Sequence, residues 1–513
     1  MHFNDLPLEI IQHVFSLCCR RVWFRIPQER DRSRSGTIQV TLLLVCSRWR
    51  EIALNTSALW GDIMVIYEAG RERARGLTAS FQFVQNWLNR AGMTPISLLI
   101  YVHEALESQI AAIPQTLLSS FHVTNLDLAS FHSFPLVPMN TLSRLERLRL
   151  SLHEPARRIG VFPRLPEVPS LKDLHLCLHP DDFVDITNIY LIPWHQLHVC
   201  TLSENHWSSQ MLFNILQRCK SLVKCTLLMK LDDGQHENDI VLSNLESLVL
   251  DMKFRGSADH IIRSLTLPNL KYLEITSWNR YSKLPVSPEA IVMMAQRSGF
   301  NQRLTYFSLC RTEQPVDVRS LLVSMPALKN VQLLGPLMFQ LGTFDDLSSG
   351  AVGPQLKEIF LGVMSDEEIT LFLETVGQRH EKAKTVSDIT PFALVTGQCT
   401  SESDFESLTR RAKQCSEAFN AHVEIMAGEV SLDPLMTGMI LDSGESDSDF
   451  GMGSASDEES YLDEESYIDE DSEEPHSFEN PSSESHWESD PDVGLDSHSG
   501  EESDPGDDVG SDT

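Results

Sequence analysis

A short apolar pattern recurs through the middle of the chain and limits its possible folds more than any other feature. The pattern is apolar-x-x-apolar-x-apolar, and successive copies begin 23 to 34 residues apart. One such triplet is weak evidence, but nine at a similar spacing indicate a repeat array. The triplets are Leu145/Leu148/Leu150, Leu171/Leu174/Leu176, Leu197/Cys200/Leu202, Leu222/Cys225/Leu227, Leu245/Leu248/Leu250, Leu270/Leu273/Ile275, Leu304/Phe307/Leu309, Leu328/Val331/Leu333 and Leu356/Ile359/Leu361.

The spacing within each triplet predicts a buried strand. Its last two positions are two residues apart, so on a strand they face the same side. Helical stretches are predicted between the strands, at 208–219, 259–265, 288–297 and 316–325. A strand inside and a wider helix outside would build a curved α/β array. The triplets resemble those of the leucine-rich-repeat family, and Cys219 before Leu222 is similar to its cysteine-containing variety. The asparagine usual after the triplet occurs only once, as Asn205.

The residues between the inward positions are predicted to form a concave, protein-binding face. They mix charge with tyrosine and arginine, which suits protein recognition. The alternative is an ordinary solvated strand surface. The candidate residues are Arg147, Arg149, Asp173, His175, Lys224, Tyr272, Glu274, Tyr306, Asn330 and Gln332.

The first sixty residues predict two amphipathic helices. Residues 5–18 form the first, with Pro7 suited to its start, and residues 37–54 form the second, followed by Leu59-Trp60. The runs Leu6-Pro7-Leu8-Glu9-Ile10-Ile11 and Val45-Cys46-Ser47-Arg48-Trp49-Arg50 resemble the two ends of an F-box. An arginine-containing insert, 19–36, separates them, and the pattern is similar to fungal F-box-like proteins, in which such inserts are common.

The F-box resemblance implies docking to a Skp-type adaptor and, through it, to a cullin scaffold. The implied adaptor-binding residues are Leu6, Pro7, Ile10, Ile11, Val14, Phe15, Val45, Cys46, Trp49 and Ile52. So short a helical unit cannot bury both apolar stripes internally, so some of that surface should need a partner. The alternative is that these helices cap one end of the repeat array.

The remaining segments complete the expected domain layout. Residues 1–65 are the F-box-like module, 66–94 hold a bridging helix at 80–90, 95–381 are the solenoid, and 382–433 are a helical cap. Trp87 is expected to be core between the bridging helix and the first repeats. Residues 366–381 form the last repeat helix, capped by Ser365, and 403–427 read as a further helix.

The net charge of −32 is concentrated at the C-terminal end. Residues 441–513 hold 27 acidic residues and no lysine or arginine, which leaves 46 acidic against 41 basic residues before them. Residues 434–513 are therefore expected to be a disordered acidic tail. It is either a solubilising or a phosphorylated segment. Candidate phosphosites resemble the acidophilic casein-kinase-II type: Ser446, Ser454, Ser456, Ser460, Ser466, Ser485, Ser489 and Ser499.

Several functional classes are not expected. The nearly neutral body argues against nucleic-acid binding, and we see no signal peptide and no apolar run long enough to span a membrane. The unpaired pattern of ten cysteines suggests a reducing compartment, cytoplasmic or nuclear. His175, Cys177 and His179 could suggest zinc, but adjacent same-face strand residues stand about 7 Å apart and a fourth ligand is missing. No catalytic motif or cofactor site is found.

The sequence thus predicts a non-enzymatic substrate receptor of a Skp–cullin–F-box ubiquitin ligase, with an unidentified protein substrate. One alternative is a leucine-rich-repeat scaffold without ligase association. Another is an acidic-tail chaperone for basic proteins such as histones. An enzyme is the least favoured alternative, since no titratable cluster stands out in the sequence.

Overall fold

A computed structural model describes residues 6–19, 21–26, 37–67, 74–102, 116–130, 142–152, 168–177, 192–230, 239–253, 258–277, 283–399 and 405–427. All of these belong to one compact unit that ends at Thr437. The acidic tail and its eight candidate phosphosites lie outside the described residues, as do His179 and most of the insert.

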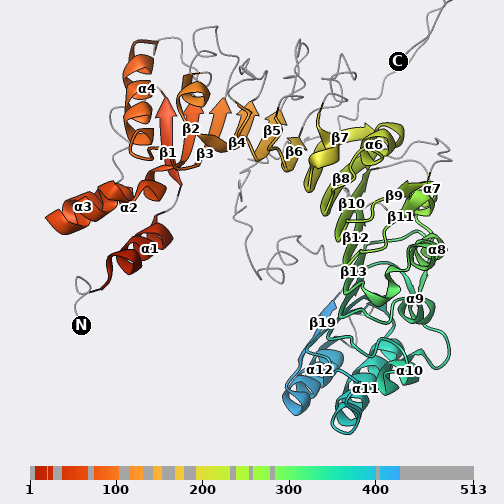
Figure 1. Ribbon diagram of the computed structural model, residues 1–513. Coiled ribbons are helices and arrows are strands. Elements are labelled where there is room, and N and C mark those ends of the chain that lie inside the picture. Colours follow the sequence, from red (N-terminus) through yellow and green to blue (C-terminus); the bar gives the residue numbers. More distant parts are fainter. Residues whose placement is uncertain are drawn as a thin grey trace, which may run out of the picture. The chain divides into compact units, whose positions relative to one another are not determined.

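A parallel sheet of 15 strands organises the described residues, and its strand order follows the sequence (Figure 1). The strands are β1 Val22–Ile26, β2 Asp62–Tyr67, β3 Ile96–Val102, β4 Val123–Ser130, β5 Arg147–Leu152, β6 Asp173–Cys177, β7 Val199–Ser208, β8 Lys224–Lys230, β10 Ser247–Lys253, β12 Tyr272–Ser277, β13 Tyr306–Leu309, β15 Asn330–Leu333, β17 Glu358–Met364, β18 Leu394–Cys399 and β19 His422–Ala427. Two short parallel pairs lie outside it: β9 Ile240–Val241 with β11 Leu265–Thr266, and β14 Val316–Asp317 with β16 Leu337–Met338.

The repeat triplets form the core of this sheet, as the sequence predicts. Every residue of the nine triplets is buried. Strand register aligns equivalent positions, for example Leu248 with Leu273 and Leu250 with Ile275. Each repeat therefore adds a layer of apolar side chains to one continuous core. Burial of one such side chain stabilises the fold by about 1.5–3 kcal/mol.

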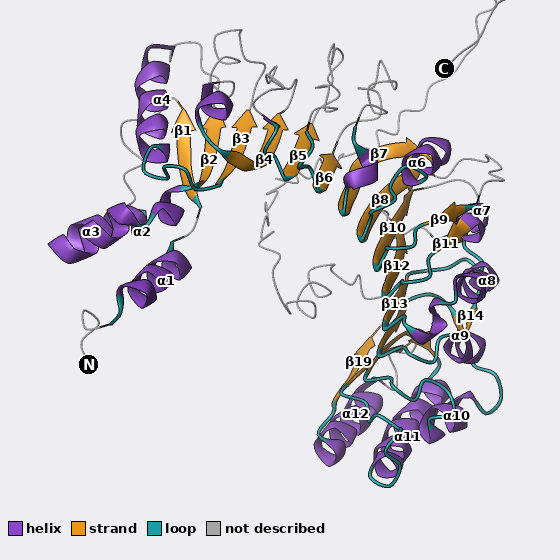
Figure 2. Cartoon of the chain, viewed as in Figure 1, coloured by secondary structure: helices purple, strands orange, loops and turns teal. Residues whose placement is uncertain are grey.

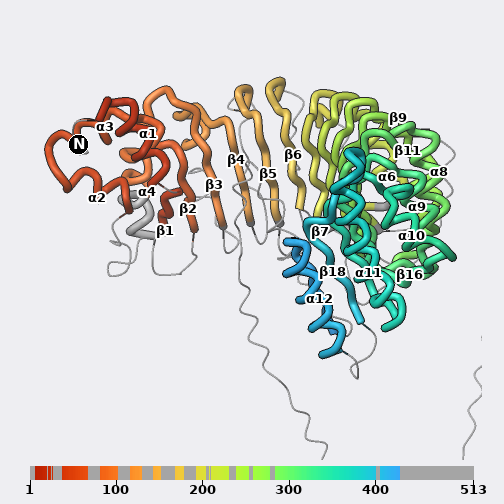
Figure 3. The backbone as a smooth tube through the Cα atoms, turned by 90° about the horizontal axis from the view of Figure 1, so that it is seen from below, coloured from red at the N-terminus to blue at the C-terminus, as the bar shows by residue number. Residues whose placement is uncertain are grey.

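In the later repeats the helices lie along one side of the sheet (Figures 2 and 3). There, α7 packs on α8, α8 on α9, α10 on α11 and α11 on α12. None of the described helices is both long and apolar enough to span a membrane. The helices are α1 Leu8–Cys18, α2 Ile38–Val45, α3 Ser47–Asn55, α4 Ala74–Leu88, α6 Ser209–Leu216, α7 Asp259–Ser264, α8 Pro288–Ser298, α9 Val318–Ser324, α10 Thr343–Ser349, α11 Asp366–Ala383 and α12 Phe405–Phe419.

The sheet begins earlier than residue 95, where the solenoid was expected to start. Inside the segment treated as an insert, Val22, Phe24 and Ile26 alternate as buried residues and form β1. This strand pairs in parallel with β2, Val22 opposite Ile63. The N-terminal module therefore contributes two strands to the same sheet, in addition to its helices.

The prediction of a single helix over 37–54 is wrong, because Cys46 interrupts the helix and divides it into α2 and α3. Cys46 is extended, with φ −159° and ψ 171°, and its Sγ accepts a hydrogen bond from the Trp49 backbone N–H at 3.4 Å. The thiol thus serves as the N-cap of α3, in the role usually filled by a hydroxyl or carboxylate. Thr37 caps α2 in the same way.

The C-terminal elements confirm one prediction and correct two others. Ser365 caps α11, as the sequence predicts, and forms a reciprocal capping box with Glu368. α11 is not the last repeat helix, because α12 packs on it and β18 and β19 continue the same sheet. The helix read over 403–427 is wrong beyond Phe419, because Val423 and Ile425 are buried in β19. Residues 382–433 thus contain β18 and β19 as well as α12.

Side-chain hydrogen bonds join the turns in place of an asparagine after each triplet. Asn244 Nδ2 donates to the Lys220 carbonyl at 3.0 Å, and Asn269 Nδ2 to the Ser243 carbonyl at 2.6 Å. Both asparagines come directly before a triplet, so each ties its turn to the preceding repeat.

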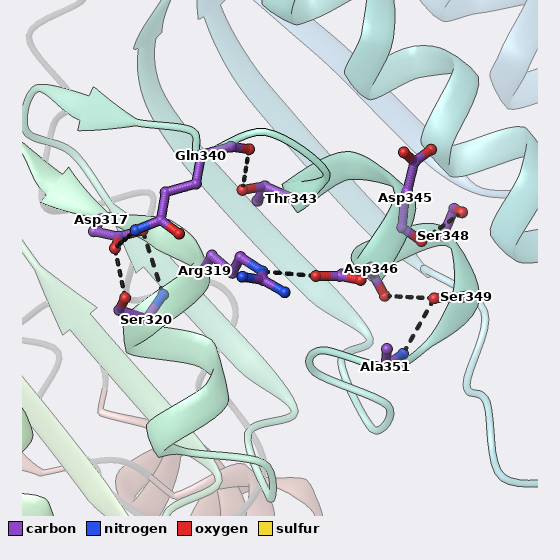
Figure 4. Close-up of polar contacts among 10 residues, drawn as sticks. All are labelled: Asp317, Arg319, Ser320, Gln340, Thr343, Asp345, Asp346, Ser348, Ser349 and Ala351. Carbon is purple, nitrogen blue, oxygen red and sulfur yellow. Dashed lines mark hydrogen bonds and ion pairs between the residues drawn. The ribbon is translucent and has the colours of Figure 1, made fainter.

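A polar cluster joins two later repeats on the helical side (Figure 4). Asp317 caps α9 through the Ser320 backbone N–H, and Gln340 donates to the same carboxylate. Arg319 Nε lies 2.7 Å from Asp346 Oδ2 on α10. These contacts fix α9 relative to the segment that leads into α10.

Candidate protein-binding surfaces

The three N-terminal helices keep a series of large apolar side chains in solvent. Leu17 is 71% exposed, Leu44 72% and Val45 53%. Leu8, Ile10, Ile38 and Leu54 are also exposed. Single exposed apolar residues are common on proteins, but seven on three short helices is unusual and typical of an interaction surface.

The predicted adaptor-binding residues divide between the interior and this surface. Ile11, Phe15 and Ile52 are buried, so they hold the helices together and contact no partner directly in this state. Those with exposed side chains are Pro7, Ile10 and Val45, and those half-buried are Leu6, Val14, Cys46 and Trp49. Sequence periodicity missed the most exposed members, Leu17 and Leu44.

Aromatic contacts tie the helices to the start of the sheet. The rings of Phe15 and Trp49 lie 5.1 Å apart, and those of Trp60 and Trp87 lie 4.8 Å apart. Trp60 Nε1 donates to the Ala53 carbonyl at 3.0 Å. Trp87 is buried against Phe24 of β1, which confirms its prediction as core. Each aromatic pair adds about 0.5–1.5 kcal/mol beyond its buried area.

The second candidate surface is the side of the sheet opposite the triplets, which we call the polar strand face. Strand register arranges its residues in two rows, with Tyr272 opposite Tyr306 in the first and Glu274 opposite Ser308 in the second. All ten predicted substrate-binding residues lie in these rows. From β5 to β17 the first row is Arg147, Asp173, Val199, Lys224, Ser247, Tyr272, Tyr306, Asn330 and Glu358, and the second is Arg149, His175, Thr201, Thr226, Val249, Glu274, Ser308, Gln332 and Phe360.

Basic residues mark the part of this face around β5 and β6. Arg147 Nε lies 2.7 Å from Asp173 Oδ2, and Arg149 Nε lies 4.0 Å from an oxygen of Asp127. His175 shares a hydrogen bond with the Ser203 hydroxyl at 3.0 Å. Burial, with a further contribution from Arg149, lowers the pKa of His175 to about 4, so this imidazole is neutral at physiological pH.

Aromatic and acidic residues mark the part around β12 and β13. The Tyr272 and Tyr306 rings stack with centroids 4.2 Å apart and planes 4° apart. The Tyr272 hydroxyl donates to Glu274, and Asn330 Nδ2 donates to Glu358 Oε2 at 2.6 Å. Tyr306 is half-buried, and burial raises its pKa to about 12.

Sequence reasoning missed Asp251, which lies on β10 two residues after Val249 of the second row. Its carboxylate is in register with Thr276, and one of its oxygens is buried without a hydrogen-bond partner. Burial raises the pKa of Asp251 to about 6; a hydrogen bond from Thr276 opposes the shift and the negative charge of Glu274 adds to it. The sequence signal that identifies it is the alternation Ser247-Val249-Asp251, because alternate residues of a strand share one face and Asp251 is the next such residue after the triplet.

The described residues contain no cluster of three potential ligands that could hold a metal ion. His175 is hydrogen-bonded to the Ser203 hydroxyl. His179, the third of the residues considered as zinc ligands, lies outside the described residues.

No family model and no curated protein matches the chain. Among solved structures, a leucine-rich-repeat protein from Leptospira interrogans matches 72% of this chain and 91% of its own length, with 12% identity and a TM-score of 0.33. So weak a likeness supports no conclusion about this chain. The repeated triplets, their shared burial and the 15-stranded parallel sheet themselves make the described fold an α/β solenoid of the leucine-rich-repeat type.

Proposed function

We propose that this chain is a substrate-recognition adaptor of a cullin–RING ubiquitin ligase. Its N-terminal helices dock to a Skp-type adaptor, and the polar strand face holds the target protein. The chain performs no chemistry in this role. It holds a substrate lysine near a charged carrier, which raises the effective concentration of the two reactants.

The exposed apolar surface of α1 to α3 is the observation that carries the proposal. Leu17, Leu44 and Val45 are more than half exposed, although Phe15 and Ile52 of the same helices are buried. A unit that served only to cap the repeats would direct its apolar residues toward the sheet. A docked partner would bury this surface. Burial stabilises the complex by roughly 25 cal/mol for each Å² of apolar surface removed from water.

The test is a pull-down of the full chain with a purified Skp-type adaptor. The variant Ile10→Glu/Val45→Glu changes two exposed positions, so it should fold and should lose the adaptor by about a hundredfold in affinity. Leu341→Glu is the matched control, because Leu341 is fully exposed and lies outside these helices. We expect the control to bind as wild type does.

Two results would change the conclusion. If wild-type protein never binds the adaptor, ligase association is lost and a protein-binding scaffold remains. If Ile10→Glu/Val45→Glu binds as well as wild type, the adaptor contacts another surface. A partner that is captured only when residues 434–513 are present, and is released by salt, would instead favour an acidic-tail chaperone.

A further inference from the structure

The sheet ends at β19, which is the last strand of the described ladder (Figure 1). The His422 N–H donates to the Ala393 carbonyl, directly before β18, at 2.9 Å, so the backbone groups of His422 face that neighbouring strand. Backbone groups of successive strand residues point to opposite sides, so those of Val423 point away from β18. Ile425 and Ala427 are the next two residues with this outward orientation. The outer edge of a sheet is a template on which a further strand can pair.

The side chains of β19 alternate in the way that favours such an addition. Val423 and Ile425 are buried on the triplet side, whereas His422 and Glu424 are exposed on the polar strand face. A strand with the same alternation could extend both the hydrogen-bond ladder and the apolar core. Soluble proteins therefore protect the edge strands of their sheets.

Ser416 of α12 occupies this edge at Val423. Its Oγ accepts a hydrogen bond from the Val423 N–H at 2.9 Å and donates one to the Val423 carbonyl at 3.2 Å. One hydroxyl thus satisfies both outward groups of the residue, because a hydroxyl is donor and acceptor at once. Asn420, in the left-handed region with φ 52°, lies in the tight turn that brings the end of α12 alongside β19. The half-buried Ser416 therefore stands where another strand would begin to pair.

The edge of β19 is complementary to itself under a two-fold axis. Two copies paired antiparallel about Ile425 would place Val423 opposite Ala427 of the second copy, and each outward residue would exchange hydrogen bonds with the residue opposite. The Glu424 side chains of the two copies would not lie directly opposite each other, so their charges would not prevent the pairing. Of the hydrogen-bonded residue pairs in this arrangement, all but the central one need the backbone groups of Val423. Because Ser416 holds those groups in each copy, only the central pair could form.

We propose that Ser416 is an edge guard, which prevents β19 from pairing with β19 of a second copy of this chain. The guard acts through its two hydrogen bonds to Val423. Loss of the hydroxyl frees both ends of the two-fold pairing and allows one sheet to continue across two molecules. The ligase role uses α1 to α3 and is independent of this device, because β19 and β1 lie at opposite ends of the strand order.

The test compares full-length variants by gel filtration with light scattering over a dilution series. We expect Ser416→Ala to dimerise with a Kd about tenfold below that of wild type, because further hydrogen-bonded pairs become possible. Ser416→Thr keeps the hydroxyl and should associate as wild type does. Ser407→Ala is the matched control, since it removes the same group from an exposed position of the same helix. Equal association of Ser416→Ala and wild type, or of Ser416→Ala and Ser407→Ala, would overturn the proposal.

A second substitution identifies the edge that is used. Ala427→Pro removes an outward N–H but leaves the bonds to β18, so Ser416→Ala/Ala427→Pro should return to the association of wild type. If the double variant still associates, another surface or partial unfolding is responsible and the edge guard is wrong. Hydrogen exchange at the Val423 amide gives an independent readout in dilute, monomeric samples. The rate should rise in Ser416→Ala, and an unaltered rate would show that Ser416 does not hold this group.

Discussion

The guanidinium of Arg379, on α11, lies over the ring of Phe392, with its central carbon 4.5 Å from the ring centroid. Arg379 is completely buried, and burial lowers its pKa to about 10. No carboxylate of the described residues pairs with it. Its donors instead reach backbone carbonyls at 2.7 to 3.5 Å, those of Leu347, Gly353, Pro354, Leu356 and Thr390. The side chain thus joins α10, the turn before β17 and the turn before β18.

We predict that Arg379→Lys destabilises the fold by about 2–4 kcal/mol, because a lysine ammonium cannot reach carbonyls on several sides at once. Urea unfolding measures the loss. Arg410→Lys, at an exposed position of α12, is the control and should change stability by less than about 0.5 kcal/mol. Equal stability of the two variants would mean that the fork of hydrogen bonds contributes little.

Asp251 should make stability depend on pH between about 4 and 6. Its folded pKa is raised to about 6 from the ordinary 3.8. Across this interval the unfolded carboxyl has lost its proton while the folded one keeps it, so stability falls as pH rises and is constant above about 6. Asp251→Asn removes this loss. After allowance for solvent screening, it should stabilise the protein by about 1–2 kcal/mol at pH 7.

The measurement is the difference in unfolding free energy between wild type and Asp251→Asn at pH 4, 5, 6 and 7. We expect the difference to grow with pH, because only the wild type loses stability. A difference that stays flat from pH 4 to pH 7 would show that the carboxyl is already ionised at pH 4 in the folded chain.

Loss of the capping box should weaken α11. Ser365→Ala removes a hydroxyl that accepts a hydrogen bond from the Glu368 backbone N–H, and should cost about 1 kcal/mol. Hydrogen exchange should become faster at the Glu368 amide, whose N–H donates to the Ser365 hydroxyl. Ser387→Ala, at an exposed site outside any helix, is the control. If both variants exchange alike, the box has no measurable role.

The repeat pattern was sufficient to predict most of the sheet. Leu248 and Leu250 are two apart on one strand and in register with Leu273 and Ile275 on the next, so spacing and burial convey the same information. The rows of the polar strand face follow directly from that alternation. Arg149, Tyr272 and Glu274 could therefore be placed on it from sequence.

Other elements depend on tertiary contacts that the sequence does not show locally. Val22, Phe24 and Ile26 lie among arginines, and the strand forms because β2 supplies a parallel partner. Cys46 sits inside an apolar helical pattern, and only its backbone conformation divides α2 from α3. At the N-terminal surface, periodicity identifies the apolar stripe but not which of its members face solvent, so Phe15 and Val45 could not be separated.

The thiols should differ sharply in reactivity, since all ten cysteines are free. Cys18 is exposed, whereas Cys200, Cys219 and Cys225 are buried in the repeat core. Burial raises the pKa of Cys219 to about 12 and those of Cys200 and Cys225 well above the ordinary value, which removes the reactive thiolate. Iodoacetamide at pH 8 should therefore modify Cys18 first and leave these three unmodified, as read by mass spectrometry of peptides. In guanidinium all ten should react, and early modification of Cys200 in the native chain would mean that the repeats open far more readily than their packing indicates.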